Sequence, residues 1–229
     1  MKSAILTLTV AALVAHASAQ TIVQTHTIPT YTASGSHGIT FDKFDTLGGT
    51  RVLNGVTVTF SFDKTGGSYA VDNDSTQQGN ITFYHELRAR LTSADVSLGT
   101  ASTYLSALSE YTTYVGADDG DPQAEFNAGG PDYALYMPDS LLGNEHTANI
   151  ASGNWGAYTG LDTFLVTFQA LQSFSVDGVG GLQSQTISSQ VGALVTVTYS
   201  YTNVVVPEPQ AALLGSIGAL LLLKRRRRN

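Results

Sequence analysis

Apolar side chains alternate strictly with hydroxyl side chains in two seven-residue stretches, Val56–Phe62 and Val195–Tyr201. Because successive side chains of a β-strand point to opposite faces, this pattern predicts strands with one buried and one polar face. Phe164, Val166 and Phe168 repeat the pattern less cleanly. Strands of this kind are typical of antiparallel sheets. We therefore expect an all-β fold, with an antiparallel β-sandwich as the first choice and a closed β-barrel as the alternative.

Shorter β-rich runs between Gly-, Asn- and Asp-rich turns predict further strands, over Thr21–Ile28, Ser68–Val71, Asn80–Tyr84, Leu87–Leu91, Val96–Leu98 and Phe174–Val176. Residues 101–111 predict a short helix or irregular structure, because Tyr104, Leu108 and Tyr111 would share one helical face. Residues 116–160 hold much of the Gly, Pro, Asp and Asn and predict long loops with a short element or two. No linker interrupts residues 21–203, which favours one domain.

The N-terminus has the features of a secretory signal peptide, predicted over residues 1–19. Lys2 precedes an apolar run of 12 residues, Ala4–Ala15, and the small-x-small sequence Ala17-Ser18-Ala19 follows. We expect signal peptidase to cut between Ala19 and Gln20, and the chain to be exported across the inner membrane.

The last segment, residues 204–229, combines an apolar run with a basic end. The run from Ala211 to Leu223 has 13 residues, so as a helix it would reach about 20 Å against about 30 Å of bilayer hydrocarbon. The basic block consists of Lys224, Arg225, Arg226, Arg227 and Arg228. Such a block stays cytoplasmic and stops transfer, which predicts a short transmembrane helix that holds the chain in the membrane transiently.

The motif Pro207-Glu208-Pro209, followed by a short apolar segment and a terminal arginine cluster, resembles the PEP-CTERM sorting signal. The resemblance covers residues 206–229. It implies processing by an exosortase, a membrane-embedded protease or transpeptidase of Gram-negative bacteria. The protein would then lose its tail and reach the cell surface or the extracellular space.

A second resemblance extends over residues 21–203. The sequence Phe41-Asp42-Lys43-Phe44-Asp45, then Leu47-Gly48, Leu53 and the alternating Val56–Thr59, resembles the opening of choice-of-anchor E domains. It implies that residues 20–203 are a β-rich exported domain of unknown biochemical activity, able to carry alternative surface-sorting tails.

The charge left after the two end segments are removed is strongly acidic. Residues 20–208 hold five basic residues and 18 acidic ones, a balance near −13. Such a surface argues against nucleic acid and anionic membranes as partners. The chain has no cysteine, which excludes disulfides, thiolate catalysis and Cys-based metal sites.

Familiar catalytic motifs are incomplete, so we expect no enzyme and assign no catalytic residue. His85-Glu86 begins like a zinc-protease helix, but Ala89 stands where the second histidine would be, and an ordinary strand residue is the better interpretation of His85. Ser36 and His37 are adjacent, yet the Gly-x-Ser-x-Gly motif is absent.

Two Asp-rich turns offer closely spaced oxygen ligands of the kind that Ca²⁺ requires: Asp72 with Asp74, and Asp118 and Asp119 with Asp121. Neither continues as an EF-hand loop, and Asp is also an ordinary turn former, so solvated turns are the favoured interpretation and a Ca²⁺ site is the alternative. Trp155 and Tyr158 could stack on a sugar ring or pack in the interior.

The sequence therefore favours an exported surface or extracellular-matrix protein with a structural or adhesive role. Exopolysaccharide is a candidate partner in such a matrix. The alternatives are a carbohydrate- or calcium-binding module that uses loops at one end of the sandwich, and, less favoured, a hydrolase.

Overall fold

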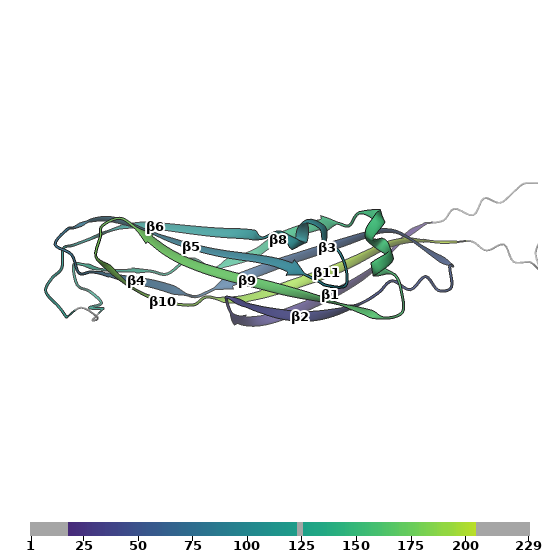
Figure 1. Cartoon of the computed structure of the whole chain (residues 1–229), viewed down its shortest axis with the longest axis horizontal. Coiled ribbons are helices and arrows are strands. Elements are labelled where there is room, and N and C mark those ends of the chain that lie inside the picture. Colours follow the sequence, from purple (N-terminus) through teal and green to yellow (C-terminus); the bar gives the residue numbers. More distant parts are fainter. Residues whose placement is uncertain (1–17, 123–125, 205–229) are drawn as a thin grey trace, which may run out of the picture.

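The computed structural model describes residues 18–122 and 126–204, and within them the predicted antiparallel β-sandwich is confirmed. The molecule is elongated, with strands running along its long axis (Figure 1). Its elements in chain order are β1 (Ala19–Thr32), β2 (Gly35–Asp42), β3 (Arg51–Thr65), β4 (Ser68–Asn73), β5 (Gly79–Thr92), η1 (Gly99–Ser102), β6 (Leu105–Val115), β7 (Tyr133–Tyr136), β8 (Leu141–Asn149), η2 (Ser152–Tyr158), β9 (Thr163–Asp177), β10 (Leu182–Ile187) and β11 (Gln190–Asn203), where η1 and η2 are short 3₁₀ helices.

The strands form three antiparallel sheets. The terminal sheet has the order β1-β11-β3-β8, the long sheet β2-β9-β5-β6 and the distal sheet β10-β4-β7. The long sheet forms one layer of the sandwich. The terminal and distal sheets lie one after the other in the second layer, and each shares a hydrophobic core with the long sheet. Each sheet keeps two edge strands among the described residues, so the alternative of a closed barrel is wrong.

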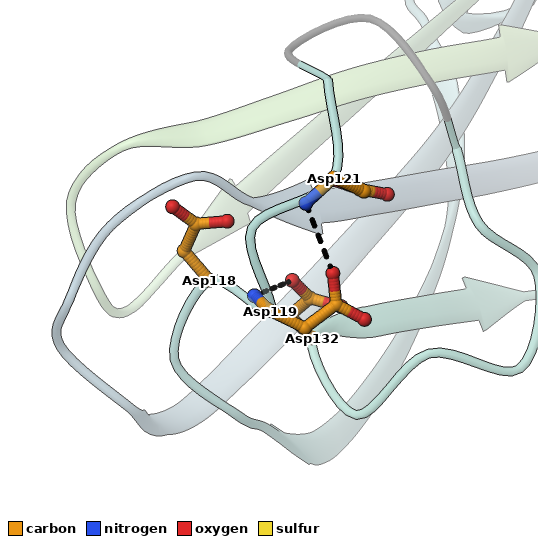
Figure 2. A group of neighbouring side chains, drawn as sticks. All are labelled: Asp118, Asp119, Asp121 and Asp132. Carbon is orange, nitrogen blue, oxygen red and sulfur yellow. Dashed lines mark hydrogen bonds between the residues drawn. The ribbon is translucent and has the colours of Figure 1, made fainter.

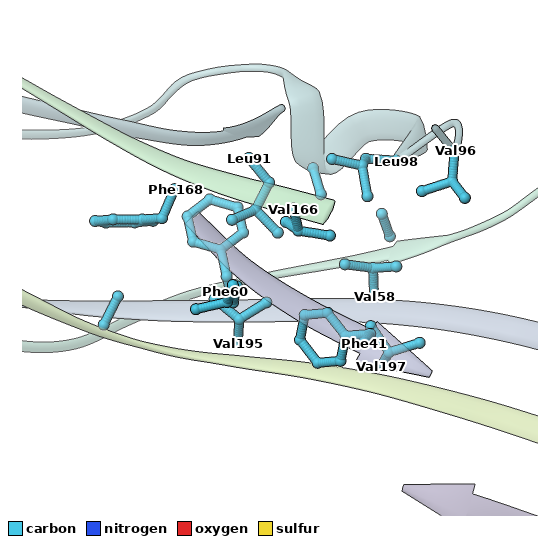
Figure 3. Packing of buried hydrophobic residues seen from close by; sticks show 14 of the residues in the cluster. Phe41, Val58, Phe60, Leu91, Val96, Leu98, Val166, Phe168, Val195 and Val197 are labelled. Atoms are coloured by element: carbon cyan, nitrogen blue, oxygen red, sulfur yellow. The ribbon is translucent and has the colours of Figure 1, made fainter. Parts of the chain in front are cut away.

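Because apolar and hydroxyl side chains alternate in Val56–Phe62 and Val195–Tyr201, one face of β3 and one face of β11 lie in the interior. Val58 pairs with Val197 and Phe60 with Val195, and all four side chains are fully buried between the terminal and long sheets (Figure 3). The hydroxyl residues face the other way and bond across strands, as in the 2.9 Å contact between the Oγ1 atoms of Thr59 and Thr147.

The sandwich has two hydrophobic cores, one after the other along its length. The first lies between the terminal and long sheets, and the second lies between the distal sheet and the far part of the long sheet. Strand β5 serves both, since Leu87 belongs to the first core and Phe83 to the second. The longest strands of the long sheet, β5 and β9, therefore tie the two halves together.

In the layer opposite the long sheet, the terminal sheet ends and the distal sheet begins at two neighbouring connections of the chain. Strand β3 ends before Gly66-Gly67, and β10 is separated from β11 by Ser188-Ser189. Gly66 and Gly67 have φ values of +65° and +89°, which L side chains rarely adopt, and a Cβ on Gly67 would collide with the Ser189 Oγ. The glycine pair lets the chain step from the terminal sheet to the distal sheet.

Three local predictions are wrong. The two strands expected over residues 80–84 and 87–91 are one continuous strand, β5, because β6 and β9 pair with it along its length. Residues 96–98 form no strand, although Val96 and Leu98 are buried in the first core. Residues 101–111 form the end of η1 and then β6, since pairing with β5 overrides the weak helical pattern. Residues 116–160 contain β7, β8 and η2 between loops.

The two ends of the described region lie together at one end of the molecule. Ala19 pairs with Thr202, and the Asn203 Nδ2 donates to the Gln20 Oε1 at 3.2 Å. Thus Ala19 and Gln20, the predicted cleavage position, begin β1. Residues 1–17, Pro207-Glu208-Pro209 and the Lys224–Arg228 block lie outside the described residues. Within the part that the structure describes, no helix is long and apolar enough to cross a bilayer.

Candidate metal centre

Six aspartates gather at the distal end, the end of the molecule formed by the β4–β5, β6–β7 and β9–β10 connections, opposite the described termini (Figure 1). Asp72 lies on β4 and Asp74 just beyond it, two residues apart and so on the same side of an extended chain. Asp118, Asp119 and Asp121 lie on the β6–β7 connection. Asp132 directly precedes β7. Because its neighbour Tyr133 pairs with Asp72, Asp132 lies beside the end of β4.

Backbone hydrogen bonds hold the three connections against one another. The amide of Asp118 donates to the Ser75 carbonyl at 2.9 Å, and the amide of Asp74 donates to the Gly181 carbonyl at 3.3 Å. The buried Asn73 side chain adds a bond from its Nδ2 to the Gly116 carbonyl at 2.6 Å. The acidic residues are therefore positioned by a cross-linked set of loops.

The first set of ligand candidates is Asp118, Asp119, Asp121 and Asp132 (Figure 2). Each offers a carboxylate oxygen, and these four atoms lie within 4.8 Å of one another. Two backbone contacts orient them: the Asp119 amide donates to the Asp132 Oδ2 at 3.0 Å, and the Asp121 amide donates to the Asp119 Oδ1 at 3.3 Å. The four residues thus hold one carboxylate oxygen each within reach of a single ion.

The second set is Asp72, Asp74 and Asp121, whose ligand atoms also lie within 4.8 Å of one another. The Gln183 side chain on β10 donates from its Nε2 to the Asp74 Oδ2 and so orients that carboxylate. Asp121 belongs to both sets.

Among residues 18–122 and 126–204, several oxygens of the six aspartates are buried and find no hydrogen-bond partner. These atoms are the Oδ1 of Asp72, the Oδ1 of Asp132 and both carboxylate oxygens of Asp121. Asp72 and Asp132 are only 2% and 1% exposed. A buried polar atom without a partner costs free energy, and a buried unpaired carboxylate costs more than a neutral group. A positively charged partner bound at these oxygens would therefore stabilise the folded protein.

Protein side chains do not supply that charge within the described ranges. Their two ion pairs join Lys43 to Asp162 and Arg88 to Glu86, and neither touches the cluster. Burial raises the pKa of Asp72 to about 6, with further contributions from the neighbouring carboxylates, of which Asp132 is the largest. Burial and the carboxylates of Asp119 and Asp132 also raise the pKa of Asp121. Hard carboxylate oxygens at this spacing suit Ca²⁺.

Five of the six aspartates are the ones that the two acidic turns indicated, and the structure brings the two turns together. Asp132 was missed, because in the sequence it is a single acidic residue after Gly129-Gly130-Pro131. The signal that could have found it is the short apolar run Tyr133–Tyr136 directly after it, which forms β7 and pairs with β4. Calcium itself stays a prediction.

The residues considered for catalysis do not assemble a site. Ser36 and His37 are neighbours on β2, so their side chains point to opposite faces of the strand. His85 lies in a strand, as expected, and contacts the Ser189 hydroxyl and the Lys64 ammonium. These three residues are so deeply buried that no substrate reaches them.

The residues considered for sugar stacking are used in packing. Tyr158 is fully buried, and its hydroxyl donates to the Ser97 carbonyl at 2.7 Å. Trp155 packs on the first core, and its Nε1 donates to the Ile150 carbonyl at 2.9 Å. Tyr158 therefore offers no face to a sugar ring, and Trp155 serves the interior.

Comparison with protein-family models and with curated protein sequences found no match. Among solved structures, the VP2 subviral particle of infectious bursal disease virus is 13% identical, with 90% of this chain and 49% of that chain covered and a TM-score of 0.18. Mud crab tombus-like virus is 10% identical, with 84% and 92% covered and a TM-score of 0.20. This chain thus spans about half the length of the VP2 chain. TM-scores this low say nothing about the function of this protein.

Proposed function

We propose that the chain is an exported surface or extracellular-matrix protein with a structural role, and that its distal end binds Ca²⁺. The observation that carries the calcium proposal is the convergence of six carboxylates, with buried oxygens of Asp72, Asp121 and Asp132 left without partners. A divalent cation would satisfy those oxygens and offset the mutual repulsion of the carboxylates.

The arrangement of the molecule supports the structural role. Both described ends lie at one end of the sandwich and the acidic loops at the other (Figure 1). A module attached at its C-terminal end, beyond β11, would present the acidic loops outward. An ion there would join the β4 end and the β6–β7 connection through their carboxylates, in addition to the backbone bonds between them.

The calcium proposal is tested by thermal unfolding of the whole chain in a non-ionic detergent, which binds no calcium. Extracellular calcium modules bind with Kd on the order of 0.1–1 mM, so the effect should appear at millimolar CaCl₂. At a hundred times Kd the stabilisation is about 2.7 kcal/mol. For a domain of this size that raises the midpoint by roughly 5–10 °C relative to EDTA.

Two controls make the result specific. The same concentration of MgCl₂ tests for ionic strength, because Mg²⁺ prefers a tighter octahedral site. The variant Asp132→Asn keeps the shape of a buried ligand but removes its charge, and should reduce the calcium-dependent rise. Equal midpoints in EDTA and in CaCl₂ would show that these aspartates are ordinary turns.

A further inference from the structure

We propose that the distal end holds two divalent cations and that Asp121 bridges them. This inference rests on the calcium binding proposed above and adds a second ion to it. The first ion would lie among Asp118, Asp119, Asp121 and Asp132, and the second among Asp72, Asp74 and Asp121.

The distances favour two ions over one. A Ca²⁺ ion contacts its oxygen ligands at 2.3–2.6 Å, so two oxygens on opposite sides of one ion lie at most about 5 Å apart. Each set meets this limit, with all its ligand atoms within 4.8 Å of one another. The six carboxylates fall into two such sets, and Asp121 is the member that they share.

Each set also contains its own unsatisfied and deeply buried oxygen. In the first set this atom is the Oδ1 of Asp132, whose Oδ2 already accepts from the Asp119 amide. In the second set it is the Oδ1 of Asp72. One ion in the first set would leave the Asp72 oxygen without a partner, and one ion in the second set would leave the Asp132 oxygen without one.

Asp121 has the features of a bridging ligand. Both of its carboxylate oxygens are buried and accept no hydrogen bond from the part of the chain that the structure describes, so one oxygen is available for each ion. A carboxylate that binds two metals through its two oxygens holds them about 3.5–4 Å apart, the usual spacing of two-metal sites. Its backbone is fixed by the bond from its amide to the Asp119 Oδ1.

The charge balance agrees with two ions. Six ionised aspartates carry −6, and neither ion pair of the described chain involves any of them. One Ca²⁺ leaves −4 in a partly buried cluster, whereas two leave −2. Backbone carbonyls of the loops and water would complete the coordination, since Ca²⁺ takes six to eight oxygens.

The test is a count of bound Ca²⁺ by isothermal titration of the whole chain in non-ionic detergent. We expect two per chain. Asp74→Asn should leave one, because it changes the second set alone, and Asp121→Asn should weaken both by at least tenfold. Asp139→Asn is the matched control: this exposed aspartate follows β7, belongs to neither set and should leave two ions bound.

A second measurement covers the case in which Asp121→Asn does not fold. With Tb³⁺ and Eu³⁺ bound together to the unaltered chain, energy transfer between the ions should report a separation on the order of 4 Å. One ion per chain, or two ions retained by Asp74→Asn, would overturn the bridged pair while leaving calcium binding intact. No bound ion at all would instead refute the proposed function, so the two failures are distinguishable.

Discussion

Lys64 on β3 and His85 on β5 meet in the interior, with the Lys64 Nζ 3.3 Å from the His85 Nδ1. Both are buried, at 2% and 0% exposure. Because the ammonium donates to Nδ1, the proton of the neutral imidazole lies on Nε2, which faces the Ser189 Oγ at 3.4 Å. Ser189 in turn donates to the Gly66 carbonyl at 3.1 Å. A polar chain thus crosses the sandwich where the terminal sheet gives way to the distal sheet.

This contact predicts a loss of stability in mild acid. Burial, followed by the charge of Lys64, lowers the pKa of His85 from 6.5 to about 4. Between pH 6.5 and pH 4, His85 is protonated in the unfolded chain and neutral in the folded chain. The contribution of neutral His85 to the free energy of unfolding is therefore complete above pH 6.5 and is lost as the pH falls toward 4. The full loss is about 3 kcal/mol. Urea unfolding in EDTA at pH 7 and pH 4.5 measures it.

The matched variant for this measurement is His85→Gln, whose amide can accept from Lys64 but does not titrate. Asp72, whose pKa burial raises to about 6, titrates in the same range, but both proteins carry it, so its effect cancels in the difference. The unaltered protein should lose more stability between pH 7 and pH 4.5 than the variant does. Equal losses would mean that His85 is not held neutral.

A double-mutant cycle should show strong coupling between Lys64 and His85. Lys64→Met alone leaves the buried Nδ1 of His85 without a donor, which costs about 1–3 kcal/mol. His85→Phe alone leaves a buried ammonium unpaired, which costs about 3–5 kcal/mol. The double variant removes both polar groups and keeps the stacking on Phe174, whose ring lies 4.3 Å from that of His85. We expect it to be more stable than either single variant, and additive losses would contradict this.

The two glycines at the break between the sheets should differ in their tolerance of alanine. At Gly66 a Cβ meets no atom within 4 Å, so Gly66→Ala bears only the strain of a positive φ, about 1 kcal/mol. Gly67→Ala bears the same strain and also forces the Ser189 Oγ aside. Thermal unfolding should therefore rank Gly67→Ala clearly below Gly66→Ala. The reverse order would mean that Ser189 does not pack against this turn.

Residues 20–203 alone should fold. Both cores and all strand pairs of the described residues lie within residues 19–203, and β1 and β11 lie at the two ends of the described region. We expect a soluble fragment with a β-type circular dichroism spectrum and cooperative thermal unfolding. A helix-rich spectrum or a gradual transition would contradict the fold.

The sorting prediction is checked separately by intact-mass analysis of exported protein. The mass should correspond to a chain that begins at Gln20 and ends near Pro207–Pro209. Exported material that still carries the Lys224–Arg228 block would refute processing of the tail.

The local sequence pattern predicted those strands that bury one face in the core and expose the other. Residues 56–62 and 195–201 alternate because one side of β3 and β11 lies in the core, and that periodicity is visible in a single strand. Residues 101–111 were misjudged because β6 is an edge strand, where Leu108 and Tyr111 remain exposed. Its strand character comes from pairing with β5, which no property of the segment itself reveals.

The amino-acid sequence by itself determined the all-β class and marked two acidic turns as places where oxygen ligands are dense, because both properties depend on residues close together in the chain. The tertiary structure alone decided that these turns lie at the same end of the sandwich and that Asp132 joins them. It also decided that Lys64 is buried against His85, which no spacing between residues 64 and 85 implies. Such contacts depend on which strands pair and in what register, and pairing is settled by the whole core rather than by any one segment.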